Sequence, residues 1–347
     1  MCSLAENTHP APNHFPQSRA KRASSPHVFG VLRMISSTAI TWIAQSPASL
    51  RVLELAHKVA DASTTVLITG ESGTGKDQLA RWIHECGPRH DAPLLKIDCA
   101  SLPSELVESE LFGHEKGAFT GAVARKPGRL ELADAGTIVL DEVAALAPGI
   151  QAKLLRVLEE RKFERLGGNE TLRMDARLIA LTNTDLTKAV SEARFREDLY
   201  FRLNILSIVV PPLRDRRADI PVLAKHFLSR LGPVHGRPDA TFSPAALRLL
   251  EAYDWPGNVR ELKNAIEHAL VFSQSPELGV ENFPEIVRMS ATHQTSGGPL
   301  RSLESLEREA IKATLEATHY KIGRAAEILG ISRKTLLEKR KKFGLIE

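Results

Sequence analysis

The stretch Thr65-Val-Leu-Ile-Thr-Gly-Glu-Ser-Gly-Thr-Gly-Lys76 decides the fold of this chain. A short β-branched run ends in a glycine-rich segment, and a helical pattern from Gln78 to Glu85 follows at once. In this order of strand, loop and helix, backbone N–H groups turn inward around phosphates, and the helix N-terminus adds positive potential. The alternative is a glycine-rich turn with a surface lysine. We expect a nucleotide to bind at Gly70, Glu71, Ser72, Gly73, Thr74, Gly75, Lys76 and Asp77.

Further along the chain, short apolar runs alternate with helical stretches. The runs cover residues 94–97, 137–140, 178–181 and 205–210, and residues 151–161 have helical spacing. This alternation predicts an α/β fold with a parallel sheet covered on both faces. After Pro211-Pro212 the strand signals stop, and helical patterns over 220–231, 244–253 and 258–272 predict a small all-helical unit. A Ser-, Thr- and Gly-rich linker then precedes a last helical segment.

An acidic pair ends the strand pattern Gly136-Thr-Ile-Val-Leu-Asp141-Glu142. Asp141 is expected to hold Mg²⁺, directly or through water, and Glu142 to polarise the attacking water. The same pair would also suit a strand that leads into a helix N-cap. Beside the phosphate-binding segment, the catalytic interpretation is favoured.

Composition limits the class of protein. With 347 residues, 43% of them hydrophobic, the chain can form two or three domains with their own cores. No apolar run approaches the roughly 20 residues of a membrane-spanning helix, and no secretory signal opens the sequence, so we expect a cytoplasmic protein without membrane attachment. Cys2, Cys86 and Cys99 are too few and irregular for a disulfide framework or a zinc site. Residues 1–41 are expected to be a disordered tail.

Positive charge gathers at the C-terminus. The chain has a formal net charge of +4, whereas residues 321–347 hold eight basic and three acidic residues, a net +5. The stretch Gly323 to Lys342 predicts a helix, a tight turn at Gly330 and a second helix capped by Ser332. Charge alone would suit a solvated helix end, and a helical hairpin could serve protein contacts only. The two features together favour nucleic-acid binding.

The hexapeptide Gly117-Ala-Phe-Thr-Gly-Ala122 resembles the signature loop of one family, the AAA+ activators of sigma-54 RNA polymerase, or bacterial enhancer-binding proteins of the NtrC type. Residues 110–117, 195–203 and 255–262 match the same family, and the resemblance runs from about Ser46 to Phe272 and resumes in the C-terminal 40 residues. It implies a AAA+ P-loop ATPase subdomain of α/β fold (42–212), an α-helical lid (213–288), a linker (289–302) and an all-α Fis-type helix-turn-helix domain (303–347).

The resemblance also assigns a partner surface. The family's loop contacts sigma-54, which here implies Gly117, Ala118, Phe119, Thr120, Gly121 and Ala122. A glycine-rich loop with one aromatic side chain can change conformation and present a hydrophobic tip, whereas an ordinary surface turn is the alternative. Residues 166–170 would form a second, supporting loop.

Further residues take roles in the ATPase by the same resemblance. Arg196 and Arg202 would be arginine fingers that reach the ATP of the neighbouring subunit in a hexameric ring, unless they pair with Glu197 and Asp198. Asn183, after Thr182, would be the first sensor of the nucleotide. Arg260 would be the second sensor, although it could equally be a helix-surface residue.

Two acidic residues depart from general patterns. Asp77 replaces the Ser or Thr that usually follows the phosphate-loop lysine, although family members commonly carry an acidic residue there. Asp98 stands where the family usually has an asparagine that holds the catalytic glutamate inactive until the partner engages. An aspartate cannot donate an amide hydrogen bond to Glu142, and like charges repel, so we expect an altered switch with ATP hydrolysis retained.

The resemblance completes the functional picture. The second helix of such a DNA-binding module enters the major groove, which implies Ser332, Arg333, Lys334 and Thr335 at the bases or phosphates and Lys339 and Lys341 at the backbone of double-stranded enhancer DNA. About 40 residues before the ATPase cannot fold into a receiver domain, so control is expected from a separate regulatory protein or from expression level, as in the receiver-less phage-shock and type III secretion activators.

Three functions remain open at this point. The favoured one is a sigma-54-dependent transcription activator that uses ATP and Mg²⁺ to remodel the RNA polymerase holoenzyme from closed to open complex. A second is a DNA-binding regulator with a vestigial ATPase, which the intact Lys76, Asp141 and Glu142 disfavour. A third is a AAA+ remodeller of another protein, such as a chelatase or unfoldase subunit, which the hexapeptide and the helix-turn-helix disfavour.

Overall fold

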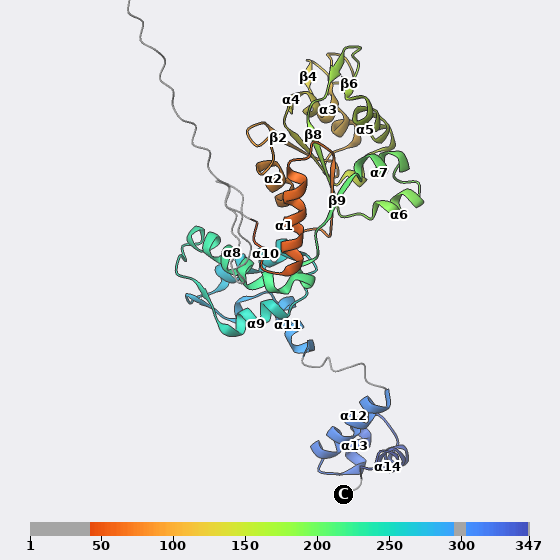
Figure 1. Cartoon of the computed structure of the whole chain (residues 1–347). Coiled ribbons are helices and arrows are strands. Elements are labelled where there is room, and N and C mark those ends of the chain that lie inside the picture. Colours follow the sequence, from red (N-terminus) through yellow and green to blue (C-terminus); the bar gives the residue numbers. More distant parts are fainter. Residues whose placement is uncertain (1–41, 295–302, 346–347) are drawn as a thin grey trace, which may run out of the picture. The chain divides into compact units, whose positions relative to one another are not determined.

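The computed structural model describes residues 42–294 and 303–345 (Figure 1). The expected N-terminal tail and the second half of the expected linker lie outside these residues. Within them, an α/β unit, a lid built mainly of helices and a C-terminal helical segment follow one another along the chain.

A five-stranded parallel sheet organises the α/β unit. Its strand order is β2-β5-β8-β1-β9, and every neighbouring pair is parallel. All four apolar runs and the run that precedes the phosphate loop form these strands, as predicted. Their bounds are β1 (Val66–Thr69), β2 (Leu94–Asp98), β5 (Thr137–Asp141), β8 (Arg177–Thr182) and β9 (Leu206–Val209).

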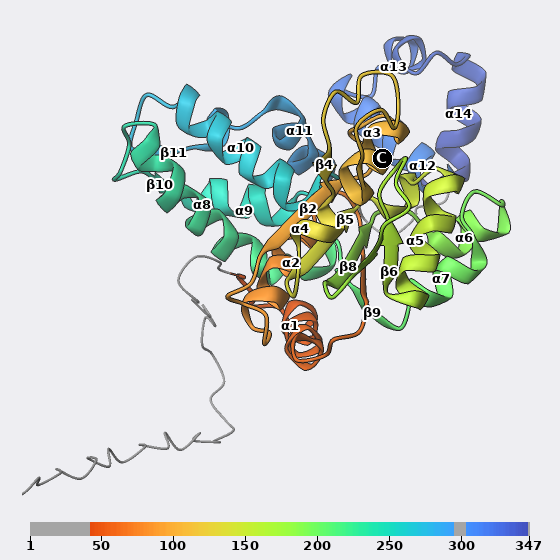
Figure 2. The ribbon, with the colours of Figure 1, turned by 90° about the horizontal axis from the view of Figure 1, so that it is seen from above.

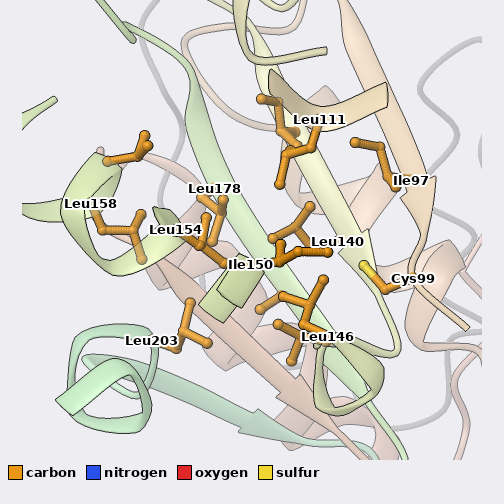
Figure 3. Packing of buried hydrophobic residues seen from close by; sticks show 14 of the residues in the cluster. Ile97, Cys99, Leu111, Leu140, Leu146, Ile150, Leu154, Leu158, Leu178 and Leu203 are labelled. Atoms are coloured by element: carbon orange, nitrogen blue, oxygen red, sulfur yellow. The ribbon is translucent and has the colours of Figure 1, made fainter. Parts of the chain in front are cut away.

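Helices cover both faces of the sheet (Figures 1 and 2). Alternate residues of one strand face opposite sides. In β5, Val139 packs in the cluster that includes helices α1 and α2, whereas Ile138 and Leu140 pack in the cluster that includes α3, α5 and α7. Figure 3 shows the second cluster, in which Leu140 and Leu178 of the sheet meet Ile150 and Leu154 of α5. The helices of this unit are α1 (Pro47–Ala60), α2 (Lys76–Glu85), α3 (Ser104–Phe112), α4 (Arg129–Leu132), α5 (Pro148–Glu160), α6 (Leu186–Ser191) and α7 (Glu197–Leu203), with a 3-10 turn at Val143–Ala145.

Two small antiparallel ladders project from this unit. Strands β3 (Gly113–His114) and β4 (Lys126–Pro127) enclose the hexapeptide, and β6 (Lys162–Glu164) and β7 (Thr171–Arg173) enclose residues 165–170. An isolated bridge pairs His114 with Leu166, so the two ladders are joined.

The lid has its own apolar core, with the fully buried Trp255 among its members. The prediction of an all-helical unit was wrong in one detail, because β10 (Thr241–Phe242) pairs in parallel with β11 (Glu277–Leu278). Two paired residues are too short for a periodic signal. The helix α11 continues through Gln294, so the first part of the expected linker is helical. The helical elements are η2 (Leu213–Asp219), α8 (Ile220–Val234), α9 (Pro244–Ala252), α10 (Asn258–Phe272), η3 (Val280–Asn282) and α11 (Glu285–Gln294).

The C-terminal segment folds as a compact three-helix group around Ile311, Leu315, Ala325, Ala326 and Leu336. Its helices are α12 (Leu303–Ala317), α13 (Ile322–Ile328) and α14 (Arg333–Lys342). Gly330 has a φ of +65° between α13 and α14, and Ser332 Oγ accepts a hydrogen bond from Thr335 N at 3.0 Å. The predicted turn and N-cap are therefore confirmed. Among the residues described, no helix has the length and apolar character needed to cross a membrane.

Candidate nucleotide-binding site and partner surfaces

The phosphate loop, Gly70–Lys76, joins β1 to α2 as the sequence predicted. Lys76 begins α2, and its Nζ donates to Gly70 O at 2.8 Å and Glu71 O at 3.2 Å. Burial lowers the pKa of Lys76, and Glu142 and Asp141 oppose that shift. The ammonium group is thus held inside the loop. There it can donate to a bound phosphate in place of the two carbonyl oxygens.

The lid contacts every loop residue from Glu71 to Thr74. Glu71 pairs with Arg214, whose Nη2 lies 2.6 Å from Oε1. The lid also donates hydrogen bonds to the next three residues. Ser72 accepts two, from Asn258 Nδ2 to its O and from Arg260 Nη1 to its Oγ, both at 3.0 Å. Gly73 O accepts from Val259 N at 3.0 Å, and Thr74 O accepts from Arg216 Nη2 at 2.6 Å. Any movement of the lid is therefore transmitted directly to the loop that surrounds the phosphates.

Two loop features explain why this close contact is possible. Gly73 has a φ of +77°, and a Cβ there would lie 2.3 Å from Gly257 O, so only glycine fits. The hydrogen bonds from Arg214 and Asn258 lower the pKa of Glu71 to about 2. Glu71 therefore stays ionised at neutral pH and keeps the loop attached to the lid. Arg260, predicted as the second sensor, reaches the loop through Ser72.

The acidic pair lies where the sequence placed it, at the end of β5. Glu142 has a φ of +54°, which turns its side chain back toward β8. Its Oε2 accepts from Asn183 N at 3.1 Å and from Thr182 Oγ1 at 3.4 Å, and its Oε1 lies 3.9 Å from Lys76 Nζ. Asn183, predicted as the first sensor, thus contacts the carboxylate of Glu142 through its backbone N–H.

Asp141 contacts Lys96, a residue that belongs to no sequence motif. Lys96 Nζ, on β2, lies 2.7 Å from Asp141 Oδ2 and 2.8 Å from Asp77 Oδ1. These two carboxylates therefore hold one cation between them. Carboxylate oxygens are also the ligands that Mg²⁺ prefers, so the pair fits a magnesium site.

Asp98, at the end of β2, caps the loop that follows it. Its Oδ1 accepts from Ala100 N at 3.0 Å and from Ser101 N at 3.1 Å. Next to it, burial and the charges of Asp98, Asp141 and Glu142 raise the pKa of the Cys99 thiol to about 12. The hydrogen bonds that Glu142 accepts come from Thr182, the last residue of β8, and from Asn183, which follows it.

The two expected arginine fingers lie at the two ends of α7: Arg196 is its N-cap and Arg202 stands in its last turn. Arg196 forms two hydrogen bonds to Asp198, at 3.0 Å and 2.7 Å, and Arg202 Nη2 donates to Leu158 O at 2.9 Å. The pairing of Arg196 with Asp198 is the alternative that the sequence left open. Both side chains are held on the side of the sheet that carries α5.

A cavity of about 240 Å³ lies beside the loop, lined mainly by Trp42, Ile43, Thr74, Gly75, Arg216 and His226. Burial and the nearby Arg230 lower the pKa of His226. Trp42 Nε1 is buried, and no hydrogen-bond partner for it is found within residues 42–294 and 303–345. No local pattern predicts this cavity, because its walls come from segments far apart in the chain.

The signature loop, Gly117–Ala122, closes on itself. Gly117 N donates to Ala122 O at 2.9 Å, and Ala122 N donates to Phe119 O at 3.0 Å. Phe119 is 42% exposed, with its ring edge-to-face against His114 at 5.0 Å between centroids. The loop thus presents an aromatic side chain at the surface.

The supporting loop, residues 166–170, is bonded to the signature loop's base. Leu166 N donates to Gly113 O, and Glu115 N donates to Leu166 O, both at 3.0 Å. The buried guanidinium of Arg165 lies 2.8 to 2.9 Å from carboxylate oxygens of Glu115, Glu131 and Glu170. One arginine therefore ties both loops and α4 together.

In the C-terminal segment, the expected DNA-binding residues gather at α14. Ser332 caps the helix, Arg333 begins it, and Lys334 and Thr335 occupy its first turn. Lys339 is paired with Glu307 of α12 at 2.5 Å, so its ammonium is shared with the protein. Lys334 and Lys341 are exposed.

Comparison with known proteins decides the family. Residues 42–209 match the Sigma-54 interaction domain, residues 214–299 the AAA+ ATPase lid domain, and residues 302–343 the Fis family of bacterial regulatory proteins. The transcriptional regulatory protein ZraR of Salmonella typhimurium is 46% identical over 304 residues, which cover 88% of this chain and 69% of ZraR. The chain belongs to the sigma-54-dependent transcriptional activators.

Other relatives agree with this membership. The regulatory protein AtoC of Escherichia coli is 42% identical over 325 residues, covering 90% of this chain and 70% of AtoC. The crystal structure of NtrX from Brucella abortus in complex with ATP superimposes with a TM-score of 0.66 at 34% identity, over 87% of this chain and 69% of NtrX. This activator is therefore a AAA+ ATPase that binds nucleotide, with sigma-54 and DNA as its partners.

Proposed function

We propose that this activator binds enhancer DNA and uses ATP hydrolysis in a hexameric ring to remodel the sigma-54 RNA polymerase holoenzyme from the closed to the open complex. The observation that carries the proposal is that one α/β unit contains both the phosphate loop, with Lys76 Nζ 3.9 Å from Glu142 Oε1, and a loop that exposes Phe119. Domain divisions at 42–212, 213–288, 289–302 and 303–347 belong to the same proposal, as does a cytoplasmic location, where DNA and the polymerase are found.

Each residue of the nucleotide site has a distinct task in this proposal. The base enters the cavity lined by Trp42 and Ile43, and the phosphate loop and Lys76 bind the phosphates. Glu142, oriented by Asn183 N, takes the proton of the attacking water. Asp141 and Asp77 would hold Mg²⁺, which neutralises charge on the phosphates when bound.

A ring is part of the proposal because the hydrogen bonds of the Arg196 and Arg202 side chains go to Asp198 and to Leu158 O, which lie outside the phosphate loop. Arg196 and Arg202 act on the ATP of the next subunit, so hydrolysis depends on assembly. For Arg196 this requires release from Asp198, at a surface where an exposed ion pair contributes little. A separate regulatory protein that acts on assembly would then control activity.

Sigma-54 is contacted by Phe119 of the signature loop, supported by Arg165. The test is co-sedimentation with purified sigma-54 in the presence of ADP and aluminium fluoride, a transition-state mimic. Phe119→Ala should abolish binding and leave ATP hydrolysis within about twofold, because Phe119 is exposed on the signature loop and is not among the residues that contact Lys76. Lys76→Ala is the matched control and should lose both. Retained sigma-54 binding by Phe119→Ala would contradict the assignment of the loop.

A further inference from the structure

Lys96 lies between the two carboxylates that the proposed function assigns to Mg²⁺. Its Nζ is within hydrogen-bond distance of both Asp141 Oδ2 and Asp77 Oδ1. Asp77 is also bonded to Arg81 Nε at 3.1 Å, on the solvent side of α2. Asp141 is the more buried carboxylate, with 20% of its side chain exposed, and Lys96 is its cationic partner at 2.7 Å.

The fold fixes this position. Lys96 stands on β2 opposite Val139 of β5, and Asp141 ends β5 two residues farther on. Asp77 lies in the first turn of α2. The lysine stem runs along the sheet edge from one strand to its neighbour's end, and the ammonium reaches the helix.

We propose that Lys96 is an internal counter-cation that occupies the metal-binding carboxylates of the nucleotide-free protein and makes divalent-cation binding dependent on ATP. This inference rests on the proposed role of Asp141 as a magnesium ligand. A divalent cation that binds Asp141 in the nucleotide-free protein is repelled by the ammonium group held at Oδ2, so its affinity is lowered. The phosphates of ATP add negative charge beside Lys76, so the site then accommodates the metal ion and Lys96 together.

The consequence is a difference between two binding equilibria. Without Lys96, Asp141 loses its cationic partner while Asp77 keeps Arg81, and the free protein should bind a divalent cation more tightly. In the same variant, ATP without metal should bind more weakly, because its phosphates meet uncompensated carboxylates. A lysine that merely stabilised the fold would change the melting temperature and neither equilibrium.

The experiment measures Mn²⁺ binding to the nucleotide-free full chain by electron paramagnetic resonance. Lys96→Met should bind Mn²⁺ at least about tenfold more tightly than wild type, whereas Lys96→Arg should behave as wild type. The double variant Lys96→Met/Asp141→Asn should lose the gain. Arg81→Met, which removes the other partner of Asp77 and leaves Asp141 paired, is the matched control and should change Mn²⁺ affinity by less than about threefold.

A second measurement compares fluorescent ATP binding with Mg²⁺ and with EDTA. The ratio of the two affinities should rise about tenfold or more in Lys96→Met. If Lys96→Met does not fold, as judged by circular dichroism, Lys96→Gln takes its place. Mn²⁺ affinity within twofold of wild type, or a gain that survives Asp141→Asn, would overturn the inference. Because Mn²⁺ binding is measured without nucleotide, loss of ATP hydrolysis in the wild-type chain would contradict the proposed function alone.

Discussion

Replacing Asn258 should separate the lid from the phosphate loop. Asn258 is fully buried at the start of α10, with a φ of +54°. Its Oδ1 accepts from Leu213 N at 2.7 Å, and its Nδ2 donates to Ser72 O at 3.0 Å and to Glu71 Oε2 at 3.2 Å. One side chain therefore joins the lid's first turn, α10 and the phosphate loop.

The size of the effect follows from these contacts. Asn258→Ala leaves the buried Leu213 N–H without an acceptor, at a cost of about 1–3 kcal/mol. Alanine at a left-handed φ adds about 1 kcal/mol over asparagine, which tolerates that conformation better. We expect a loss of about 3 kcal/mol in the free energy of unfolding of the lid, or roughly a hundredfold in its folding equilibrium.

Urea denaturation followed by tryptophan fluorescence measures this loss, because Trp255 is buried in the lid. Two further variants separate the lost hydrogen bond from the backbone strain. Asn258→Gly removes the backbone strain and should be about 1 kcal/mol more stable than Asn258→Ala. Asn258→Asp keeps the acceptor for Leu213 N and places a second carboxylate beside Glu71, so it should weaken ATP binding more than it weakens the lid. A loss below about 0.5 kcal/mol for Asn258→Ala would refute the reasoning.

Three other predictions concern separate parts of the chain. Asp98→Asn keeps an acceptor for Ala100 N and removes a charge, so basal ATP turnover or its stimulation by sigma-54 should change, and no change in either would contradict the altered switch. The pKa of Glu71 lies below its ordinary value of 4.5, so its contact with Arg214 should stabilise the protein fully above pH 4.5 and lose that effect as pH falls toward about 2. In Glu71→Gln, the fall of stability at acid pH should become less steep. An unchanged pH–stability curve would count against the contact. Ser332→Ala should lower the stability of the α14 segment by about 1 kcal/mol and weaken DNA binding in a mobility-shift assay. Ser332→Asp can also cap the helix, so it should keep α14 stable but still weaken DNA binding by its negative charge.

Local patterns were enough to predict the elements that carry the chemistry. The strand, the phosphate loop and α2 are consecutive in the sequence, so the motif and its flanking patterns predict all three elements together. Asp141 and Glu142 end an apolar run, and Gly330 and Ser332 mark a turn and a cap by their residue types. In each case the determining interaction is short in sequence, and the structure agrees.

Contacts between distant segments could not be predicted. Arg214 and Arg216 contact the phosphate loop from more than 140 residues away, and nothing in their local sequence distinguishes them from other surface arginines. Lys96 is a polar residue in an edge strand. Polar residues are common there, so its position in the sequence does not indicate a contact with Asp141. The ladder of β10 and β11 has two residues on each side, too few for any period. Such features depend on the tertiary arrangement.

The geometry also provides a short physical path from the nucleotide site to the signature loop. Asp98 fixes Ala100 and Ser101 through its carboxylate, immediately before α3. Leu111, at the far end of α3, is anchored in the core that Figure 3 shows, and β3 and the signature loop follow directly. Because a closely packed core moves between discrete arrangements and does not deform smoothly, a change at Asp98 would shift α3 as a body. Asp98 accepts its hydrogen bonds from Ala100 and Ser101, whereas the phosphate loop accepts hydrogen bonds from the lid. We therefore expect the aspartate at position 98 to affect communication with sigma-54, and the contacts between the phosphate loop and the lid to stay as they are.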